Sequence, residues 1–249
     1  MNNLSLENYL VTGLDIPLGI LGKIPQPTLR DLIENNIDID TLVRPFLISK
    51  DSLGLDKDNP LYDKVTNFDL LFVEDLVIDG LQVFKLLVDS LKFIYSVSEN
   101  EIQLLGQELH ISNKAIINGE NFDILAKVIM AMYHKQPSKS KPKPKVKNEA
   151  QRKVLEKIQK KREQQAKKNT LALFDYINIV CHIKGFIGYD KVLDLTYYQL
   201  LNSYSVLTSI ENHREFISYY TSMKFDIKEN SKHWLQTIKI NENLIKIPS

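Results

Sequence analysis

A short segment rich in lysine and proline divides this chain of 249 residues and limits how the rest can fold. Residues 136–148 read QPSKSKPKPKVKN, with three prolines and a single aliphatic side chain, Val146. Proline lacks the backbone N–H that helices and central strands need, and it pushes the preceding residue to extended geometry. The segment also has too little apolar surface to offset the entropy cost of ordering it. We therefore expect an exposed linker with folded segments on either side.

Positive charge is concentrated in and just after this linker. Residues 135–168 carry 14 Lys and Arg against three Glu, a net charge of +11, whereas the remaining residues carry 18 basic and 28 acidic side chains. Residues 149–170 contain no Gly or Pro, and Glu149, Glu156 and Glu163 each stand four positions before a lysine, a spacing that stabilises a helix. Apolar positions are too few for a coiled coil. We interpret this segment, the basic arm, as a charged helix projecting from the linker.

The residues before the linker predict short helices and strands. Glycine and proline punctuate residues 14–23, which predicts one or two short strands with a turn. Thr28 follows as the predicted N-cap of a short helix. Residues 67–95 have apolar side chains at helical spacing, which predicts core helices capped at Asn67 and interrupted near Gly80.

After residue 100 the spacing of apolar side chains changes from that of a helix to that of a strand. Residues 101–111 alternate apolar and polar side chains on both sides of Gly106, which predicts a β-hairpin, with a third short strand at 115–117. Asn121 then predicts the N-cap of a helix that runs into the linker.

Beyond the basic arm, the chain reads as helical. Residues 171–183 are apolar on most faces and predict a buried helix. Thr196 and Gln199 have the spacing of a capping box and predict the start of a long helix, on which Tyr197 and Tyr204 share one stripe.

The fold class that these patterns predict is mainly α (α+β). We expect helical lobes, a small β-hairpin or short antiparallel sheet in the N-terminal lobe, and a projecting basic helix. The expected divisions are 1–135, an N-terminal α+β lobe; 136–170, the basic Lys/Pro linker and charged helix; and 171–249, a C-terminal helical lobe. The sequence leaves open whether the two lobes pack together.

No residue pattern indicates catalysis, a cofactor or a metal. Cys181 is the single cysteine, and its neighbour His182 diverges from it by about 100° on a helix. The five histidines lack zinc-ligand spacing, and no phosphate-binding glycine motif occurs. Lys23 is the first basic side chain, and no apolar run is long enough to span a membrane, so we expect neither a secretory signal nor a membrane partner. We expect a non-enzymatic, cytoplasmic protein without cofactors.

Five segments, taken in their order along the chain, carry a resemblance to known proteins. They are IPQPTLRDLIE (residues 24–34), NFDLLF (67–72), ELHISNKAIINGENFDILAKVI (108–129), NEAQRKVLEKIQKK (148–161) and DLTYYQLLNSYSVL (194–207). This order resembles proteins encoded among the tail genes of phages that infect Gram-positive bacteria, which are described as tail assembly proteins or chaperones. The resemblance implies a non-enzymatic helper in the infected cytoplasm that keeps the long tape-measure protein soluble while the tail tube polymerises. It supplies no catalytic residues.

We therefore expect a phage tail assembly factor that binds a long helical client, with binding residues on the basic arm and on the tyrosine stripe. The residues assigned to this role are Lys141, Lys143, Lys145, Lys147, Arg152, Lys153, Val154, Leu155, Ile158, Lys160, Lys161, Arg162, Tyr197 and Tyr204. Two alternatives stay open. One is a nucleic-acid-binding protein that uses the arm, which the interleaved glutamates disfavour. The other is a structural virion component of the tail, baseplate or connector that packs against copies of itself.

Overall fold

The computed structural model describes residues 5–53, 62–73, 77–78, 81–136, 171–182 and 187–221. Its α-helices are α1 (Leu6–Thr12), α2 (Leu29–Glu34), α3 (Ile39–Val43), α4 (Val83–Tyr95), α5 (Phe122–Met132), α7 (Leu173–His182), α8 (Tyr189–Leu193) and α9 (Tyr197–Tyr220). Its 3₁₀ turns are η1 (Gly19–Leu21), η2 (Arg44–Leu47), η3 (Asp69–Phe72) and η4 (Glu99–Glu101). Its strands are β1 (Ile16–Pro17), β2 (Lys23–Ile24), β3 (Val77–Ile78), β4 (Leu81–Gln82), β5 (Ile102–Leu105), β6 (Glu108–Ile111) and β7 (Ala115–Ile117).

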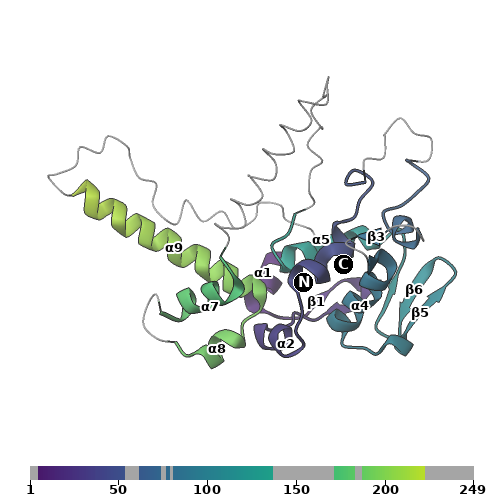
Figure 1. Cartoon of the computed structure of the whole chain (residues 1–249), viewed down its shortest axis with the longest axis horizontal. Coiled ribbons are helices and arrows are strands. Elements are labelled where there is room, and N and C mark those ends of the chain that lie inside the picture. Colours follow the sequence, from purple (N-terminus) through teal and green to yellow (C-terminus); the bar gives the residue numbers. More distant parts are fainter. Residues whose placement is uncertain are drawn as a thin grey trace, which may run out of the picture.

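The predicted fold class is confirmed, because helices dominate and the described strands form small antiparallel sheets. Figure 1 shows the helix α9 running away from the body at one end, while the β5–β6 hairpin lies at the other. The predicted linker and basic arm, from residue 137 to 170, lie outside the described residues.

The first predicted strands and helix form as expected. β1 pairs with β2 in antiparallel register, with Ile16 opposite Ile24. Thr28 caps α2 through a capping box, in which the Asp31 carboxylate accepts from the Thr28 backbone N–H at 2.8 Å and the Thr28 hydroxyl accepts from the Asp31 N–H at 3.2 Å. Two of the four N–H groups that a helix start leaves without partners are thereby satisfied.

The prediction of core helices throughout 67–95 is wrong for the first half of that segment. The structure has the 3₁₀ turn η3 and the two-stranded β3–β4 pair there, and α4 begins only at Val83. Thr66 makes the capping contacts, since the Asp69 carboxylate accepts from its backbone N–H at 2.7 Å. The side-chain Oδ1 of Asn67 instead accepts from the Lys50 backbone N–H at 3.0 Å. Helical spacing of buried leucines does not distinguish an α-helix from a tight 3₁₀ turn, because both place neighbouring turns on one face.

The predicted hairpin and third strand are confirmed. β5 pairs with β6 and β6 with β7, and Gly106 occupies the first position of the two-residue turn with φ of 64°. A positive φ at that position is what glycine supplies in a tight hairpin. Asn121 stands at the predicted N-cap of α5, but its side chain does not cap the helix; its Oδ1 accepts from the Asn118 N–H at 2.9 Å instead.

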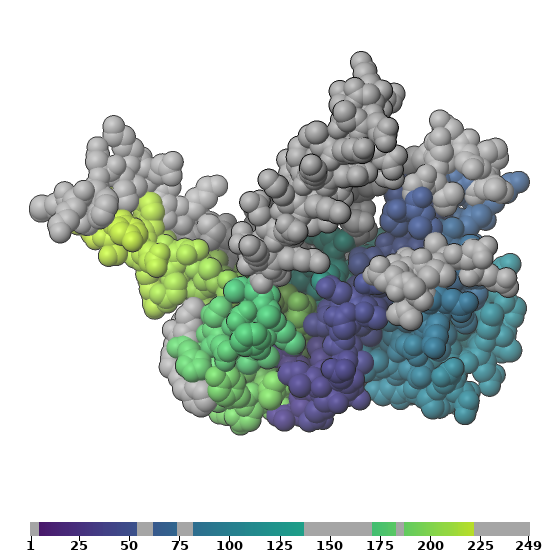
Figure 2. Space-filling view, viewed as in Figure 1, coloured from purple at the N-terminus to yellow at the C-terminus, as the bar shows by residue number. Residues whose placement is uncertain are grey.

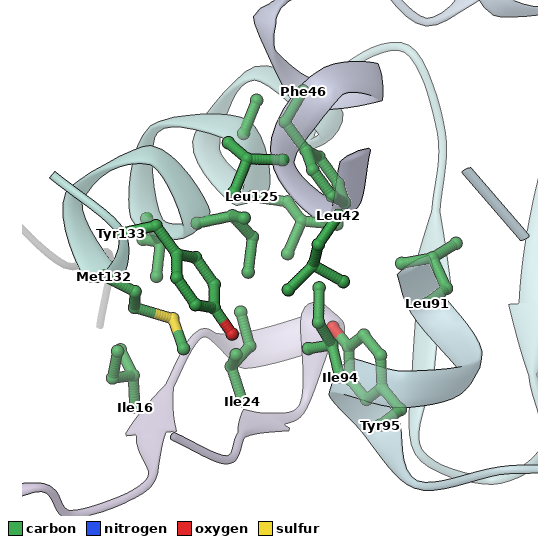
Figure 3. Close-up of a cluster of buried hydrophobic side chains, with 14 of the residues drawn as sticks. Ile16, Ile24, Leu42, Phe46, Leu91, Ile94, Tyr95, Leu125, Met132 and Tyr133 are labelled. Atoms are coloured by element: carbon green, nitrogen blue, oxygen red, sulfur yellow. The ribbon is translucent and has the colours of Figure 1, made fainter. Parts of the chain in front are cut away.

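One hydrophobic core joins the residues on both sides of the linker. Leu10, Ile24 and Leu125 from the N-terminal part are buried in the same cluster as Cys181 and Leu200 from the C-terminal part. Figure 3 shows how side chains of α4 and α5 converge on the β1–β2 strands within this core. The question that the sequence left open is thus answered: the two parts pack together.

The two capping boxes of α2 and α9 meet at this junction. Thr28 and Thr196, the N-cap residues of the two helices, pair in an isolated antiparallel β-bridge. The Leu29 N–H donates to the Leu195 carbonyl at 2.8 Å, and the Arg30 guanidinium pairs with the Asp194 carboxylate at 3.0 Å. The start of α9 is therefore fixed to the start of α2 by backbone as well as side-chain contacts.

Candidate partner-binding surface

The predicted binding residues divide into those outside and those inside the described part of the chain. The twelve on the linker and basic arm, from Lys141 to Arg162, lie outside it. Tyr197 and Tyr204 lie on α9 and can be placed.

α9 starts as the sequence predicts. The Thr196 hydroxyl accepts from the Gln199 N–H at 3.2 Å, and the Gln199 side-chain oxygen accepts from the Thr196 N–H at 2.9 Å. The Gln199 amide also donates to the Val11 carbonyl at 2.9 Å, so the capping residue ties the helix to α1. These hydrogen bonds of the first turn fix the direction of α9 relative to α1.

Both predicted tyrosines pack against the protein's own body. The Tyr197 ring lies 5.9 Å from that of Tyr133, and burial is the main cause that raises the pKa of the Tyr197 hydroxyl. The Tyr204 ring meets the Tyr176 ring of α7 edge-on, at 4.8 Å and 87°. Each ring is half-buried, so what remains for a partner is the outer part of each side chain.

α7 buries one face only. Ile177, Val180 and Cys181 are buried against the core, but Phe174 is 63% exposed. The expectation of a helix buried on most faces is therefore wrong for the outer face of α7, since α9 and α8 cover it from one side. An exposed phenylalanine on an ordered helix is a typical anchor for a partner protein.

The end of α9 carries a second apolar group, the α9 tip, which consists of the partly buried Phe216 and the exposed Ile217 and Tyr220. The rings of Phe216 and Tyr220 stack at 5.9 Å and 20°, and Ile217 is 44% exposed. Figure 2 shows the last turns of α9, in yellow, at one end of the coloured residues, away from the purple and teal ones. Sequence reasoning missed both Phe174 and the α9 tip. The signal was present as apolar side chains at i, i+1 and i+4 in the last predicted turns, but a pattern of this kind does not say where a helix leaves the body.

An open groove of about 580 Å³ lies between α2 and the end of α4. The Lys92 ammonium pairs with Asp89 at 3.4 Å and with Glu99 at 3.3 Å, and the Gln26 Nε2 donates to the Tyr9 carbonyl at 2.8 Å, while the buried Gln26 Oε1 has no hydrogen-bond partner in the structure. The groove therefore presents no set of converging reactive groups.

The side chains with chemical reactivity do not assemble either. Within the described ranges, no group of three His, Cys, Asp or Glu side chains is placed to hold a metal ion. Cys181 is fully buried, and burial raises the pKa of its thiol, which keeps the thiol protonated and unreactive. Among the helices that the structure describes, none is long and apolar enough to cross a membrane.

A comparison with protein families finds a match, and the matched residues include α7, α8 and α9. The family described as YomV second domain matches residues 160–239, about a third of the chain, and this match indicates a phage-type protein family. The matched segment includes both Phe174 and the α9 tip. No curated protein and no solved structure matches the chain significantly.

Proposed function

We propose that this chain is a phage-encoded assembly factor that binds a helical partner protein through Phe174 and the α9 tip. The observation that carries the proposal is that α9 continues beyond the body and ends in exposed Ile217 and Tyr220, with the partly buried Phe216 ring stacked on that of Tyr220. α1, α5 and α7 hold the first half of α9, and its exposed apolar end is stabilised when a second helix covers that end.

The energetic gain is sufficient for a reversible complex. Full burial of a large apolar side chain contributes about 1.5–3 kcal/mol, so covering the exposed part of Phe174 (63%) or Ile217 (44%) contributes about 1–2 kcal/mol each. A few such anchors give the affinity of a transient helper, provided that the helix presenting them is already ordered, as α7 and α9 are. Residues 216–220 at the end of α9 carry no charge, although Glu211, Arg214 and Glu215 precede them, and Arg214 pairs with Glu211 at 2.6 Å; this end favours an apolar partner surface over an ionic one.

For the partner we propose the tape-measure-like tail protein of the same phage. Two observations support this choice: the phage-type family match over residues 160–239, and the resemblance of the segment order to tail assembly proteins. A tape-measure protein is a long amphipathic helical polymer, which is the kind of client that exposed helical anchors fit.

Co-expression with the tape-measure-like protein tests the proposal. We expect the two proteins to co-purify, and we expect the client's soluble fraction to rise when the wild-type chain is present. Phe174→Ser and Ile217→Ser should each weaken co-purification several-fold, because each removes one apolar anchor.

Ile33→Ser on α2 is the matched control, because Ile33 is about half exposed and lies outside the family match. A proposal of this kind fails if the client does not co-purify, or if Ile33→Ser weakens binding as much as Ile217→Ser does. Salt-sensitive binding to DNA at the same protein concentration, lost on removal of residues 137–168, would instead favour the nucleic-acid alternative.

A further inference from the structure

The three-stranded sheet ends in an edge that nothing in the described structure covers. The strand order is β5-β6-β7, so β5 has a neighbour on one side only. β5 reads Ile102-Gln103-Leu104-Leu105, without proline and without charge. Natural edge strands usually carry a lysine, a proline or a bulge that prevents another strand from pairing. β5 has none of these protections.

The backbone groups that face outwards on β5 can be assigned from the register. Leu105 opposes Glu108 across the two-residue turn, Gln103 opposes His110, and the Ser112 N–H donates to the Glu101 carbonyl at 2.7 Å. In an antiparallel pair, alternate residues direct their backbone groups to the partner strand. The groups that point away from β6 are therefore the N–H and C=O of Leu104 and the C=O of Ile102.

One face of this sheet packs on the core, and the row of apolar side chains across that face is buried on β6 and β7 but partly exposed on β5. Leu109 and Ile117, on β6 and β7, are buried and share this face with Leu104 across the strands. Leu104 itself is 46% exposed, although it belongs to the same row. A further strand beside β5 would extend the row and cover Leu104 with its own inward side chains.

The opposite face sets the charge of whatever binds. Glu101, Glu108 and His110 lie on it, and β5, β6 and β7 contain no lysine or arginine; the Glu108 carboxylate contacts His110 Nε2 at 3.2 Å and accepts from the Asn118 amide at 3.2 Å. The Ser98 backbone N–H donates to the Glu101 carboxylate at 2.9 Å and lowers its pKa, which keeps that carboxylate ionised. A strand with basic side chains on this face would be attracted to it.

We infer that the outer edge of β5 is a docking site for one extended strand of a partner protein, with apolar side chains next to Leu104 alternating with basic side chains on the Glu101–Glu108 face. A second copy of this chain fits less well. Two β5 strands paired antiparallel about Leu104 set Glu101 of each copy opposite the uncharged Gln107 of the other, so this pair gains none of the charge attraction that a basic strand gains. The site is separate from Phe174 and the α9 tip.

A pair of labelled peptides tests this inference on the full chain. The first is TVKVTVKVT, which alternates valine with threonine or lysine, and the second has glutamate in place of each lysine. Fluorescence anisotropy should show that the lysine peptide binds, that added salt weakens it, and that the glutamate peptide binds at least ten-fold more weakly.

The backbone of Leu104 provides the sharpest variant. Leu104→Pro removes an N–H that faces away from β6, so the β5–β6 hydrogen bonds are left in place. We expect at least a ten-fold loss of affinity for the lysine peptide, whereas Leu104→Val, which keeps the N–H, should bind within about two-fold of wild type. Circular dichroism melting checks that both variants fold.

A lysine peptide with N-methyl groups on alternate residues gives the same test on the wild-type protein, should Leu104→Pro not fold. Methylation of the residues that face the sheet should abolish binding, because strand pairing needs those N–H groups. Equal binding by Leu104→Pro or by the methylated peptide overturns the inference, as does a wild-type chain that fails to bind the lysine peptide. A dimer that Leu104→Pro dissociates would also overturn it, in favour of pairing between two copies.

Discussion

The hydroxyl groups of Tyr95 and Tyr133 are buried in the same core, but they differ in how they are satisfied. The Tyr95 hydroxyl donates to the Leu21 carbonyl at 2.9 Å, whereas the Tyr133 hydroxyl has no hydrogen-bond partner in the structure. Figure 3 shows the Tyr133 ring pointing from α5 towards the β1–β2 ribbon, among aliphatic side chains. An unpaired buried hydroxyl is unfavourable, since it loses its water without replacing it.

We expect Tyr133→Phe to raise the free energy of unfolding by about 1 kcal/mol, because it removes that unpaired group and keeps the ring. Tyr95→Phe, the control, should lower it by about 1–3 kcal/mol, because the Leu21 carbonyl loses its donor. Urea denaturation followed by circular dichroism measures both changes. Destabilisation of similar size by both substitutions would show that a water molecule satisfies the Tyr133 hydroxyl.

Gly22 occupies a position that no other residue fits. Its φ is 71°, and a Cβ atom there would overlap the Lys114 carbonyl oxygen in the turn before β7. Gly22→Ala should therefore lower the free energy of unfolding by about 3 kcal/mol, the sum of backbone strain and a backbone clash.

Gly19→Ala is the matched comparison for Gly22→Ala, because Gly19 also has a positive φ, 57°, but has nothing within 4 Å of a Cβ position. Only the strain remains, so a loss of about 1 kcal/mol is expected. Thermal melts of the two variants separate the contribution of the clash from that of the strain. Equal losses would contradict the proposed contact with the Lys114 carbonyl.

Among the helix starts, those with a capping box, α2 and α9, were predictable, whereas the caps predicted at Asn67 and Asn121 did not form. A capping residue acts on groups three positions away, so Thr28 and Thr196 could be recognised without knowledge of the tertiary structure. The β5–β6–β7 sheet was equally readable, because its alternation and the turn at Gly106 are local signals. The prediction failed in the segment around Leu70 and Leu71, which was expected to be an α-helix. Both leucines are buried there in a 3₁₀ turn, because a run of apolar side chains can be buried by several kinds of turn.

The candidate binding surface was less predictable than the elements that carry it. Tyr197 and Tyr204 could be assigned to one stripe, but a stripe does not show whether the protein's own body or a partner covers it. Phe174 seemed part of a buried helix for the same reason. Exposure depends on which neighbours pack on a helix, and that information lies in distant parts of the chain.

The capping box of α9 gives a prediction for this helix. Thr196→Ala should lower the free energy of unfolding by about 1 kcal/mol, because the Gln199 N–H loses its acceptor. Thr208→Ala, in the middle of the same helix, should be neutral or slightly stabilising, since alanine has the higher helix propensity. Urea titrations of the two variants make the comparison, and a larger effect at Thr208 would contradict this account of how α9 begins.

At the scale of the whole molecule, the shared core predicts that residues before and after the linker unfold together. Leu200→Ala, at a fully buried position on α9, should cost about 2–5 kcal/mol. Hydrogen exchange should then show the same loss of protection at Leu87 and Leu91 on α4 as at residues of α7. Loss of protection confined to α7 and α9 would mean that the C-terminal part unfolds separately.

The β-bridge between Thr28 and Thr196 fixes the N-terminal end of α9 to the N-terminal end of α2. α9 has 24 residues and is about 36 Å long. A small rotation of its first turn therefore displaces its last residues much further than it displaces the residues of the first turn. The same rotation would strain the backbone bond between Leu29 and Leu195, and with it the start of α2. A force on the distal end of α9 should therefore load the contact between Tyr204 and Tyr176 of α7 and then that hydrogen bond, which links the matched family segment mechanically to the N-terminal body.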